Sequence, residues 1–569
     1  MPTLEEIRHS TAHILAAAVT KLWPDVKLGI GPVIEDGFYY DFDLKHRFTP
    51  EDLPKIEEVM YELIKKNEKF EKKSTSAENA KKQFKNDPYK LELIKEFEKE
   101  GKQISFYKTG DFIDLCKGPH AESTKQLGNF KLLKISGSYW RGDSKNKPMQ
   151  RIYGTSFPTK QELDNYLHIL EESKHRDHRI LGEQLNLFFF HEYSPGAPIF
   201  LPNGTIIYNE LINLLREEYK KRGYQEVITP LLYEKTLWEK SGHWEHYKEN
   251  MFNMESEKKI FSLKPMNCPS HCLIFKHKIW SYKELPLRIA DFAQLHRNEL
   301  SGTLSGLTRV RKFSQDDAHI FLTEDQLEEE IERLLDFEKY IYNGVFKLSY
   351  IMTLGTRPDE YLGDKKIWDK AEKILQEILK KKKISFKIAE KDGAFYGPKI
   401  DLKVKDALNR EWQLATIQLD FQIPLRFELT YEGKDGKKHT PIIIHRAVYG
   451  SIERFIALIT EHYAGKFPVW LSPVQVVVTT VADRHIDHAK KLCEEMKNKG
   501  IRIELDDRTE SIPKKVRDNQ AMKIPYIATI GDKEIENHNI TIRTRDNKLI
   551  SMKKEEFINK ILDEIKNKE

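Results

Sequence analysis

The stretch HRNELSGTLSGLTRVRKFSQDDAHIF at residues 296–321 decides how this chain folds. Arg297 and Glu299 alternate near its start, and a loop of Gly, Ser and Thr separates them from a second run that contains more arginine. Alternate residues of a strand share one face of a sheet, where a guanidinium can clamp a phosphate and a carboxylate can accept from an amine. Alone, such an Arg-x-Glu pair is more often a surface ion pair.

Two further patterns stand on either side of this stretch. RGYQEVITPLL at 222–232 predicts a strand that ends at Pro230, and HRAVYGSIERFIALI at 445–459 predicts a glycine turn into an apolar helix. Around them, residues 177–468 alternate long helices with strands, which favours an α+β domain with a mainly antiparallel sheet. Residues 469–569 follow a β-α-β-α-β order instead, which predicts a compact α/β domain with some parallel pairing.

The N-terminal region mixes helical stretches with short strand-like runs such as GFYYDFDL at 37–44. Residues 51–102 are rich in Lys and Glu and are typical of exposed helices. Leu163, Tyr166, Leu167 and Leu170 recur at helical spacing, which predicts an amphipathic linker helix. We therefore expect domains at 1–160, 177–468 and 469–569, with the linker helix at 161–176.

Composition narrows the class of protein. A chain of 569 residues is too long for one core, and a net charge of +5 is compatible with nucleic-acid binding without demanding it. Four cysteines in so long a chain are not a disulfide framework, which favours a reducing, cytoplasmic location. The chain has no run of 18 apolar residues and no signal-peptide pattern, so we expect no membrane partner.

In this order, the three patterns resemble motifs 1, 2 and 3 of the class II aminoacyl-tRNA synthetases. Within this class, the chain most resembles the threonyl-tRNA synthetase family, and the resemblance covers essentially its whole length. The segments that carry it are KPMNCPSH, LPLRIADFAQLHRNE, RVRKFSQDDAHIF, GAFYGPKI, WQLATIQLDF and IHRAVYGSIERF. It implies an antiparallel-sheet class II core, an N-terminal α+β editing domain and a C-terminal α/β anticodon-binding domain. It also implies activation of L-threonine with ATP, transfer to tRNA(Thr), hydrolysis of mischarged seryl-tRNA, and a homodimer formed through motif 1.

The resemblance implies roles for single residues. Arg297 would hold the ATP α-phosphate, Glu299 the adenine amine, Arg309 and Arg454 the outer phosphates, and Phe313 would face Arg454 across the adenine. Gln413 would also contact ATP, Mg²⁺ would accompany it, and no protein nucleophile is needed because positioning and charge neutralisation suffice. The remaining implied residues are Gln315, Asp317, Tyr396 and Gln418 around threonine, with His243 and Lys399 in catalysis.

A zinc site is implied by the same resemblance. Cys268, His319 and His445 lie far apart, so spacing does not select them, and a buried core residue is the commoner fate of each. The family binds one Zn²⁺ per chain through one Cys and two His at these motif positions, which leaves an open coordination position. A metal that binds a hydroxyl separates threonine from the nearly isosteric valine, which an apolar pocket does poorly.

The segments RHSTAHILAA (8–17) and DLCKGPH (114–120) place His9 and His13, and Cys116 and His120, four residues apart. On a helix this spacing can hold a metal or a reacting water. The resemblance assigns these residues to the editing pocket, together with Lys90 and Asp114. We expect imidazoles and Lys90 to activate water without a metal, although related alanyl-tRNA editing domains use the same residue types to bind zinc.

Several alternatives stay open at this point. A prolyl- or seryl-type synthetase would share the three motifs but lack the Cys–His–His trio. A metal-dependent hydrolase would use only the first domain, and a non-catalytic synthetase-like RNA-binding or regulatory protein would not need Arg297, Glu299 and Arg454. Many family members carry a further small N-terminal domain, and this chain begins directly at the editing domain. In the C-terminal domain, the basic residues suited to phosphate contacts, or else to a solvated helix face, are Arg508, Lys514, Lys515 and Arg517.

Overall fold

The structure is a computed structural model that describes residues 2–143, 145–406 and 410–569. It divides into two compact units, residues 1–171 and 172–569, and each is described by itself. The division falls inside helix α5 (Lys160–Arg176), which occupies the segment predicted as a linker helix.

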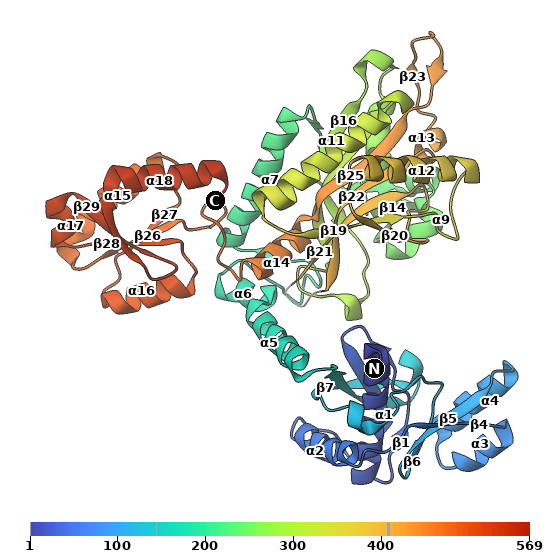
Figure 1. The fold of residues 1–569 in the computed structure, drawn as a ribbon. Helices are drawn as coiled ribbons and strands as arrows, with labels where there is room; N and C mark the ends of the chain where they lie inside the picture. The colour runs from blue at the N-terminus through green and yellow to red at the C-terminus, as the bar shows by residue number, and fades with distance from the viewer. Residues whose placement is uncertain (1, 144, 407–409) are drawn as a thin grey trace. The chain divides into compact units, whose positions relative to one another are not determined.

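The N-terminal unit is built on two antiparallel sheets (Figure 1). Helix α1 (Leu4–Leu22) begins in a capping box between Thr3 and Glu6 and packs on the larger sheet. Residues 51–102 contain the predicted helices and also a strand, β4 (Glu71–Thr75), which pairs with β5 (Ile104–Thr109). The larger sheet comprises β1 (Lys27–Leu28), β2 (Val33–Ile34), β3 (Gly37–Asp43), β8 (Pro148–Ser156) and β7 (Phe130–Tyr139); the smaller comprises β4 (Glu71–Thr75), β5 (Ile104–Thr109) and β6 (Phe112–Leu115); the helices are α2 (Asp52–Lys65), α3 (Ala77–Gln83) and α4 (Pro88–Lys99).

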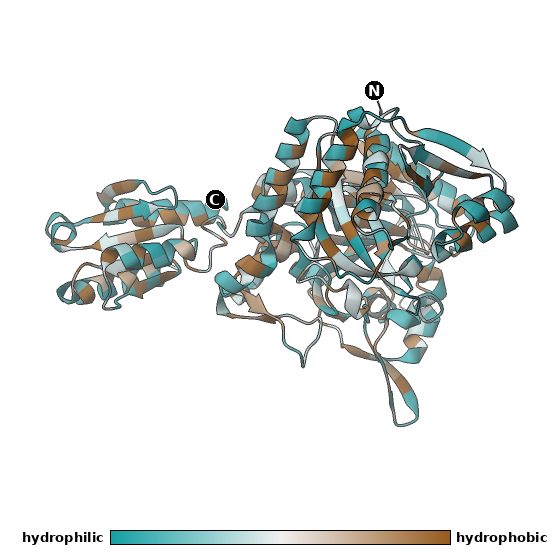
Figure 2. Cartoon of the chain, turned by 90° about the horizontal axis from the view of Figure 1, so that it is seen from below, coloured by the Kyte–Doolittle hydropathy of each residue, from teal (hydrophilic) through white to brown (hydrophobic). Residues whose placement is uncertain are grey.

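The second unit contains a nine-stranded, largely antiparallel sheet. Helices that cover it contribute buried apolar residues to its core, and Figure 2 shows apolar and polar residues alternating along helices of the chain. The strands are β11 (Gln225–Glu226), β16 (Leu287–Asp291), β17 (Gln294–His296), β18 (Lys312–Leu322), β25 (Ile442–Ser451), β22 (Glu411–Asp420), β21 (Lys399–Lys405), β19 (Tyr350–Gly355) and β20 (Phe386–Ala389); the main helices are α7 (Pro202–Lys221), α11 (Leu327–Lys339), α12 (Lys365–Lys381) and α14 (Ile452–His462). The predicted α+β class is confirmed, although β11–β16 and β19–β20 pair in parallel.

Smaller elements surround this sheet. Helix α10 (Cys268–Lys276) begins at a cysteine and lies among the residues of a separate apolar cluster. The other elements are α6 (His178–Gln184), β9 (Phe188–Phe189), β10 (Ile199–Phe200), β12 (Leu232–Glu234), α8 (Lys235–Ser241), α9 (His243–Tyr247), β13 (Asn253–Ser256), β14 (Lys259–Leu263), β15 (Trp280–Ser281), α13 (Ile423–Arg426), β23 (Tyr431–Glu432) and β24 (Lys438–His439).

Two strand predictions were wrong in extent. The strand expected across Arg297 and Glu299 ends at His296, because the Glu299 N–H turns back to the Arg297 carbonyl oxygen (2.9 Å). The Arg297 N–H still pairs with the Arg311 carbonyl oxygen at 2.9 Å. Before Pro230 in the first motif the strand covers only Gln225–Glu226, which leaves most of the predicted strand outside the sheet.

The predicted C-terminal α/β fold is confirmed, with its strands and helices between residues 476 and 567. Strand β26 (Val476–Thr480) pairs in parallel with β27 (Ile503–Asp506) and β28 (Tyr526–Ile530), while β29 (Asn539–Thr544) and β30 (Leu549–Lys553) extend the sheet antiparallel. The helices are α15 (Ile486–Asn498), α16 (Ile512–Ala521), α17 (Asp532–Asn537) and α18 (Lys554–Asn567). Throughout the described ranges, no helix has the length and apolar character needed to cross a membrane.

Candidate active site and metal centre

A cavity of about 250 Å³ lies over strands β18, β22 and β25. Its wall combines side chains from the turn after β17, from the sheet itself and from the first turn of α14, which carries Arg454. All six predicted ATP-binding residues and two of the four predicted threonine-binding residues line it: Arg297, Glu299, Arg309, Phe313, Gln413, Arg454, Gln315 and Gln418.

The cavity is strongly cationic. Burial, and then the nearby Arg297 and Arg309, lower the pKa of Arg454 to about 10. Its guanidinium is held by the carbonyl oxygens of Thr308 (2.9 Å) and Gln413 (3.1 Å), not by a carboxylate. This excess of positive charge in a hollow suits a polyphosphate.

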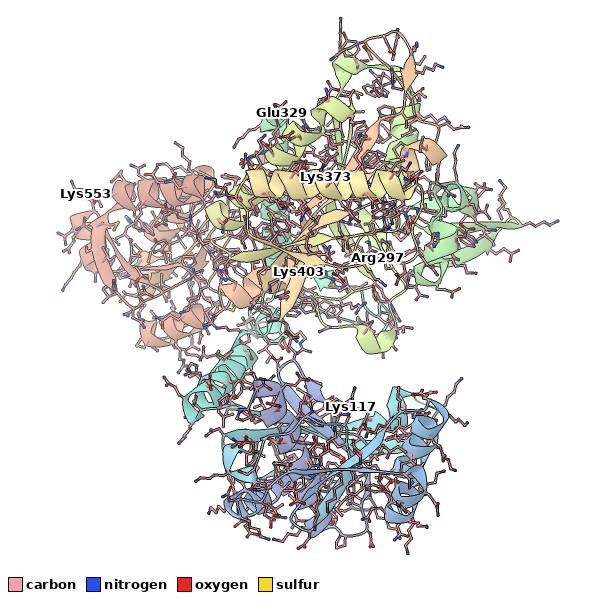
Figure 3. The ribbon with its side chains drawn as sticks, turned by 45° about the vertical axis from the view of Figure 1, so that its right-hand side comes forward. Lys117, Arg297, Glu329, Lys373, Lys403 and Lys553 are labelled. Atoms are coloured by element: carbon pink, nitrogen blue, oxygen red, sulfur yellow. The ribbon has the colours of Figure 1, made fainter. Side chains whose placement is uncertain are left out.

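Two lining groups add shape and polarity to this charge. The Arg297 guanidinium lies 5.0 Å from the centre of the Phe313 ring, and Arg454 lines the same cavity (Figure 3 labels Arg297). Glu299 accepts a hydrogen bond from Arg309 Nε at 3.1 Å. A flat aromatic base could stack on such a ring.

Tyr396 connects the cavity to a buried cluster behind it. Its hydroxyl donates to Gln418 Oε1 (2.5 Å), and its ring stacks on the His445 ring with centroids 4.8 Å apart. Asp317 is buried and accepts a hydrogen bond from Asn267 Nδ2 at 3.0 Å. These side chains offer hydroxyl, amide and carboxylate groups at the inner end of the cavity.

The two predicted catalytic residues outside the cavity lining are both paired. His243 is fully buried, with Nδ1 2.8 Å from Ser241 Oγ and Nε2 3.9 Å from Cys268 Sγ. Burial lowers the pKa of His243 to about 3, so its imidazole is neutral. The Lys399 ammonium forms an ion pair with Asp401 at 2.8 Å.

Three residues far apart in the sequence converge at this buried cluster. Cys268 at the start of α10, His319 on β18 and His445 on β25 place their ligand atoms within 4.8 Å of one another. The two histidines are direct partners across the β18–β25 ladder, with His319 Nε2 2.9 Å from His445 Nδ1. The outer ring nitrogens are held by Asp420 Oδ2, 2.8 Å from His445 Nε2, and by His271 Nδ1, 2.8 Å from His319 Nδ1.

The chemistry of this trio fits a zinc ion. One thiol and two imidazoles are zinc ligands, and a carboxylate on the far nitrogen of a histidine fixes its tautomer and raises its basicity. Burial lowers the pKa of His319 well below its ordinary value, which leaves the neutral form that binds metal. Burial also raises the pKa of the Cys268 thiol, an effect that a neighbouring cation would oppose.

A second trio lies in the N-terminal unit. Cys116 Sγ is 3.2 Å from His9 Nε2 and 3.2 Å from His120 Nε2, and the two imidazole rings are stacked. The far nitrogens contact neutral groups, Pro119 O at 3.0 Å from His9 Nδ1 and Ser10 Oγ at 3.1 Å from His120 Nδ1. Burial raises the pKa of the Cys116 thiol to about 11.

His13 is not part of this trio. It is 3% exposed, its ring centre lies 5.2 Å from that of His120 and 4.8 Å from that of Phe112, and among the described residues its Nε2 has no hydrogen-bond partner. Burial lowers the pKa of His13 to about 4. Of the two histidines paired by spacing, His9 therefore joins Cys116 and His120 as a third possible ligand, and His13 contacts the His120 ring edge-on.

Lys90 and Asp114 form a buried ion pair of their own, with Nζ and Oδ1 2.6 Å apart. The Tyr40 hydroxyl donates to Asp114 Oδ2 and accepts from Lys90 Nζ at 3.2 Å. Lys90 is only 2% exposed, so its ammonium is committed to protein partners.

Sequence reasoning missed several of these partners. Asp420 follows Gln418 by two residues on β22, so strand alternation places both on one face and could have identified it. His271 lies within the motif that carries Cys268, but nothing in that motif separates a ligand from its neighbour. Tyr40 sits on a strand far from Lys90 and Asp114, and no local signal connects them.

The C-terminal domain departs from the prediction for its basic residues. Lys515 is 2% exposed and donates to the Thr480 carbonyl oxygen (3.3 Å), so the prediction that it contacts phosphate is wrong. Arg508 pairs with Asp506 and Asp518. The other two residues are Lys514, which pairs with Glu510, and Arg517, which is exposed.

Three family models match separate parts of the chain. The tRNA synthetase class II core domain (G, H, P, S and T) matches residues 252–463, and an anticodon binding domain matches 475–564. The threonyl and alanyl tRNA synthetase second additional domain matches residues 104–153.

Similar proteins extend the match over nearly the full length. Threonine–tRNA ligases from Acetivibrio thermocellus and Thermotoga maritima are 52% and 50% identical to it over 565 and 566 residues. These alignments cover 99% of this chain and 89% and 88% of the two relatives.

Solved structures agree with the sequence matches. The RNA binding domain of threonyl-tRNA synthetase from Cryptosporidium parvum is 45% identical, with a TM-score of 0.66, over 68% of this chain and 98% of that one. Prolyl-tRNA synthetase from the same organism, 16% identical with a TM-score of 0.55 over 68% of this chain and 74% of that one, shares the fold. The chain therefore belongs to the threonine–tRNA ligase family of class II aminoacyl-tRNA synthetases.

Proposed function

We propose that this chain activates L-threonine with ATP to threonyl-adenylate and transfers the threonyl group to tRNA(Thr). The observation that carries this proposal is the convergence of a cationic cavity and a buried Cys268–His319–His445 trio on one sheet. The cavity supplies groups for a nucleotide, and the trio supplies a site for a small polar amino acid at its inner end.

In this proposal ATP occupies the cationic cavity with Mg²⁺. Arg297 binds the α-phosphate, while Arg309 and Arg454 bind the outer phosphates. The adenine ring lies against Phe313, with its amine at Glu299 and further contact from Gln413. Attack of the threonine carboxylate on the α-phosphorus then needs alignment and neutralised charge, both of which fixed guanidiniums provide.

Threonine is proposed to bind between Asp317, Tyr396, Gln315 and Gln418. Zinc held by Cys268, His319 and His445, one ion per chain, would supply a Lewis acid that ligates the amine and hydroxyl of threonine. Asp317, which Asn267 holds in place, would accept a hydrogen bond from the threonine hydroxyl. Valine cannot satisfy these buried polar groups, which accounts for its rejection.

His243 and Lys399 are proposed to act near the reacting groups. A neutral His243 imidazole could accept a proton from the tRNA hydroxyl during transfer. Lys399 would need to leave Asp401, at 2.8 Å, or act together with it.

Threonine-dependent ATP–pyrophosphate exchange tests this proposal, with serine, valine and proline as comparison amino acids. We expect strong exchange with threonine, weaker exchange with serine and very little with valine or proline. Preferred exchange with proline would indicate a prolyl-type enzyme, and no exchange with any of the four would favour a non-catalytic role.

The N-terminal unit is proposed to hydrolyse seryl-tRNA(Thr). Serine lacks only the threonine methyl, and a missing methyl is worth about 10- to 200-fold in discrimination. His9, Cys116 and His120 lie together with His13 beside them, and they could position water against an aminoacyl ester. Lys90 and Asp114 contribute through their buried pair.

Deacylation of purified seryl-tRNA(Thr) tests this editing proposal. His9→Ala should lower the rate by at least 100-fold and leave threonine-dependent exchange unchanged. Metal analysis of the purified chain separates the two modes of hydrolysis, because one zinc per chain favours a metal-free editing pocket and two favour a metal in both trios.

A homodimer is proposed from exposed apolar residues around motif 1. Ile228 is 95% exposed, Tyr193 88%, Leu232 43% and Leu231 41%. Ile228, Leu231 and Leu232 are clustered in sequence, and exposed apolar side chains of this kind are typical of a subunit interface. Ile228→Glu should therefore yield monomers in analytical ultracentrifugation, whereas Ile279→Glu, at another exposed apolar site, should not.

The remaining parts of the proposal concern tRNA and location. Residues 469–569 would read the tRNA(Thr) anticodon, with Arg517 available for phosphate contact. A cytoplasmic location fits the four cysteines, none of which forms a disulfide.

A further inference from the structure

Asp316 occupies an irregular place in the sheet that carries the active site. On one side of it Gln315 pairs with Ser451, and on the other Asp317 pairs with Ala447. Strand β25 therefore has Val448, Tyr449 and Gly450 opposite the single residue Asp316. This bulge removes the regular strand partners that these backbone N–H groups would otherwise have.

The Asp316 carboxylate replaces those partners. Oδ2 accepts from the Val448 N–H at 2.7 Å, and Oδ1 accepts from the N–H groups of Tyr449 and Gly450, both at 2.9 Å. The side chain is 1% exposed and also pairs with Arg446 Nη1 at 3.2 Å. Without this carboxylate, three backbone N–H groups would lose their acceptor, which is costly inside a protein.

The bulge leads directly into the proposed ATP site. Gly450 has φ +71°, and a Cβ atom there would lie 2.5 Å from the Leu414 carbonyl oxygen. The next residue, Ser451, caps helix α14 by accepting from the Arg454 N–H at 3.2 Å. The backbone path held by Asp316 therefore sets where helix α14 begins and where Arg454 enters the cavity.

Strand alternation separates Asp316 from the substrate itself. Gln315 lines the cavity, and Asp317 lies with Gln315 on the same face of β18, so Asp316 faces the opposite side of the sheet. There it contacts Arg446 and Tyr219. It cannot touch ATP, and any effect on ATP must act through the backbone of β25.

We propose that Asp316 is a positioning residue for ATP: its carboxylate fixes the Val448–Gly450 bulge and thereby places Arg454 against the triphosphate. This inference rests on the proposed function, because it assumes that ATP binds in the Arg454 cavity. Asp316 would thus influence how the phosphates of ATP are bound, although it lies on the side of the sheet that faces away from the cavity.

Steady-state ATP–pyrophosphate exchange with the full chain tests this proposal, using Asp316→Asn and Asp316→Ala. We expect the KM for ATP to rise at least tenfold in Asp316→Ala, with the KM for threonine changed less than threefold. Asp316→Asn keeps one acceptor oxygen but turns an amide toward the third N–H, so its KM for ATP should be intermediate. Glu330→Gln is the matched control, since Glu330 is also buried and pairs with an arginine, Arg288, on a different strand, β16.

Several outcomes would overturn this role. A wild-type KM for ATP in Asp316→Asn would do so even if Asp316→Ala failed to fold. Equal increases in KM for ATP and threonine, or the same increase in Glu330→Gln, would reveal a general structural effect. Wild-type exchange with threonine is measured first, so failure of the proposed function itself would be seen separately.

Discussion

Replacement of Lys90 by methionine should destabilise the N-terminal unit, because it breaks a buried ion pair with Asp114. The Lys90–Asp114 pair is 2% and 6% exposed at its side chains, with 2.6 Å between the charged atoms. Loss of one member leaves an uncompensated buried charge, which costs about 3–5 kcal/mol. The Tyr40 hydroxyl still donates to Asp114 but cannot neutralise it.

Native-state hydrogen exchange measures this cost locally, which matters because a chain of several domains does not unfold in one step. Amides of β3 and α4 should exchange roughly 10²- to 10³-fold faster in Lys90→Met, as 1.4 kcal/mol corresponds to tenfold. Lys95→Met, on the exposed side of the same helix, should leave exchange unchanged. Lys90→Met with Asp114→Asn should recover most of the protection, because no bare charge remains.

The rate of seryl-tRNA(Thr) hydrolysis by the same variants distinguishes a structural role of Lys90 from a direct role in the reaction. If Lys90 acts by holding Asp114 and Tyr40, the double variant should recover hydrolysis together with protection. Unchanged exchange in Lys90→Met, combined with a hydrolysis rate at least 100-fold lower, would refute this reasoning. Lys90 would then act on the substrate or on its water.

Three other perturbations have defined outcomes. Cys268→Ala should lose its zinc and its threonine-dependent exchange together, and exchange at the wild-type rate in a zinc-free variant would contradict the metal assignment. Gly450→Ala should abolish exchange, because its Cβ would meet the Leu414 carbonyl oxygen at 2.5 Å in a left-handed conformation; retained activity would show that the bulge can move. Glu338 is 1% exposed, neither carboxyl oxygen has a hydrogen-bond partner within the described residues, and burial raises its pKa well above 4.5. The folded state therefore keeps a proton that the unfolded state releases, so stability falls as pH rises above 4.5, by about 1.4 kcal/mol per unit up to the folded pKa. Glu338→Gln should flatten the fall in melting temperature between pH 5 and 8, and an unchanged profile would contradict the buried, protonated state.

The order of helices and strands could be predicted from the sequence more accurately than the local backbone geometry. Long periodic segments such as the helix over Pro202–Lys221 were predictable, because an apolar stripe must face a core. The end of β17 was not, since the turn of Glu299 back to Arg297 depends on backbone bonds that residue types do not specify. The prediction for Lys515 was wrong for a related reason. A basic residue on a helix can point inward when a backbone carbonyl oxygen accepts a hydrogen bond from its ammonium group.

The two Cys–His–His trios show which groups of possible metal ligands cannot be recognised from their spacing in the sequence. Four-residue spacing selected the pair Cys116 and His120 and paired His9 with His13, while no spacing rule selects the histidines that meet across β18 and β25. What distinguishes the trios is the partner on each far nitrogen. His445 has the Asp420 carboxylate there, whereas His9 and His120 have a carbonyl oxygen and a hydroxyl. A carboxylate raises the basicity of an imidazole ligand, and removal of such partners typically costs 10- to 100-fold in metal affinity. By this criterion we favour the Cys268 trio as the zinc site, and we propose that the His9 trio handles water.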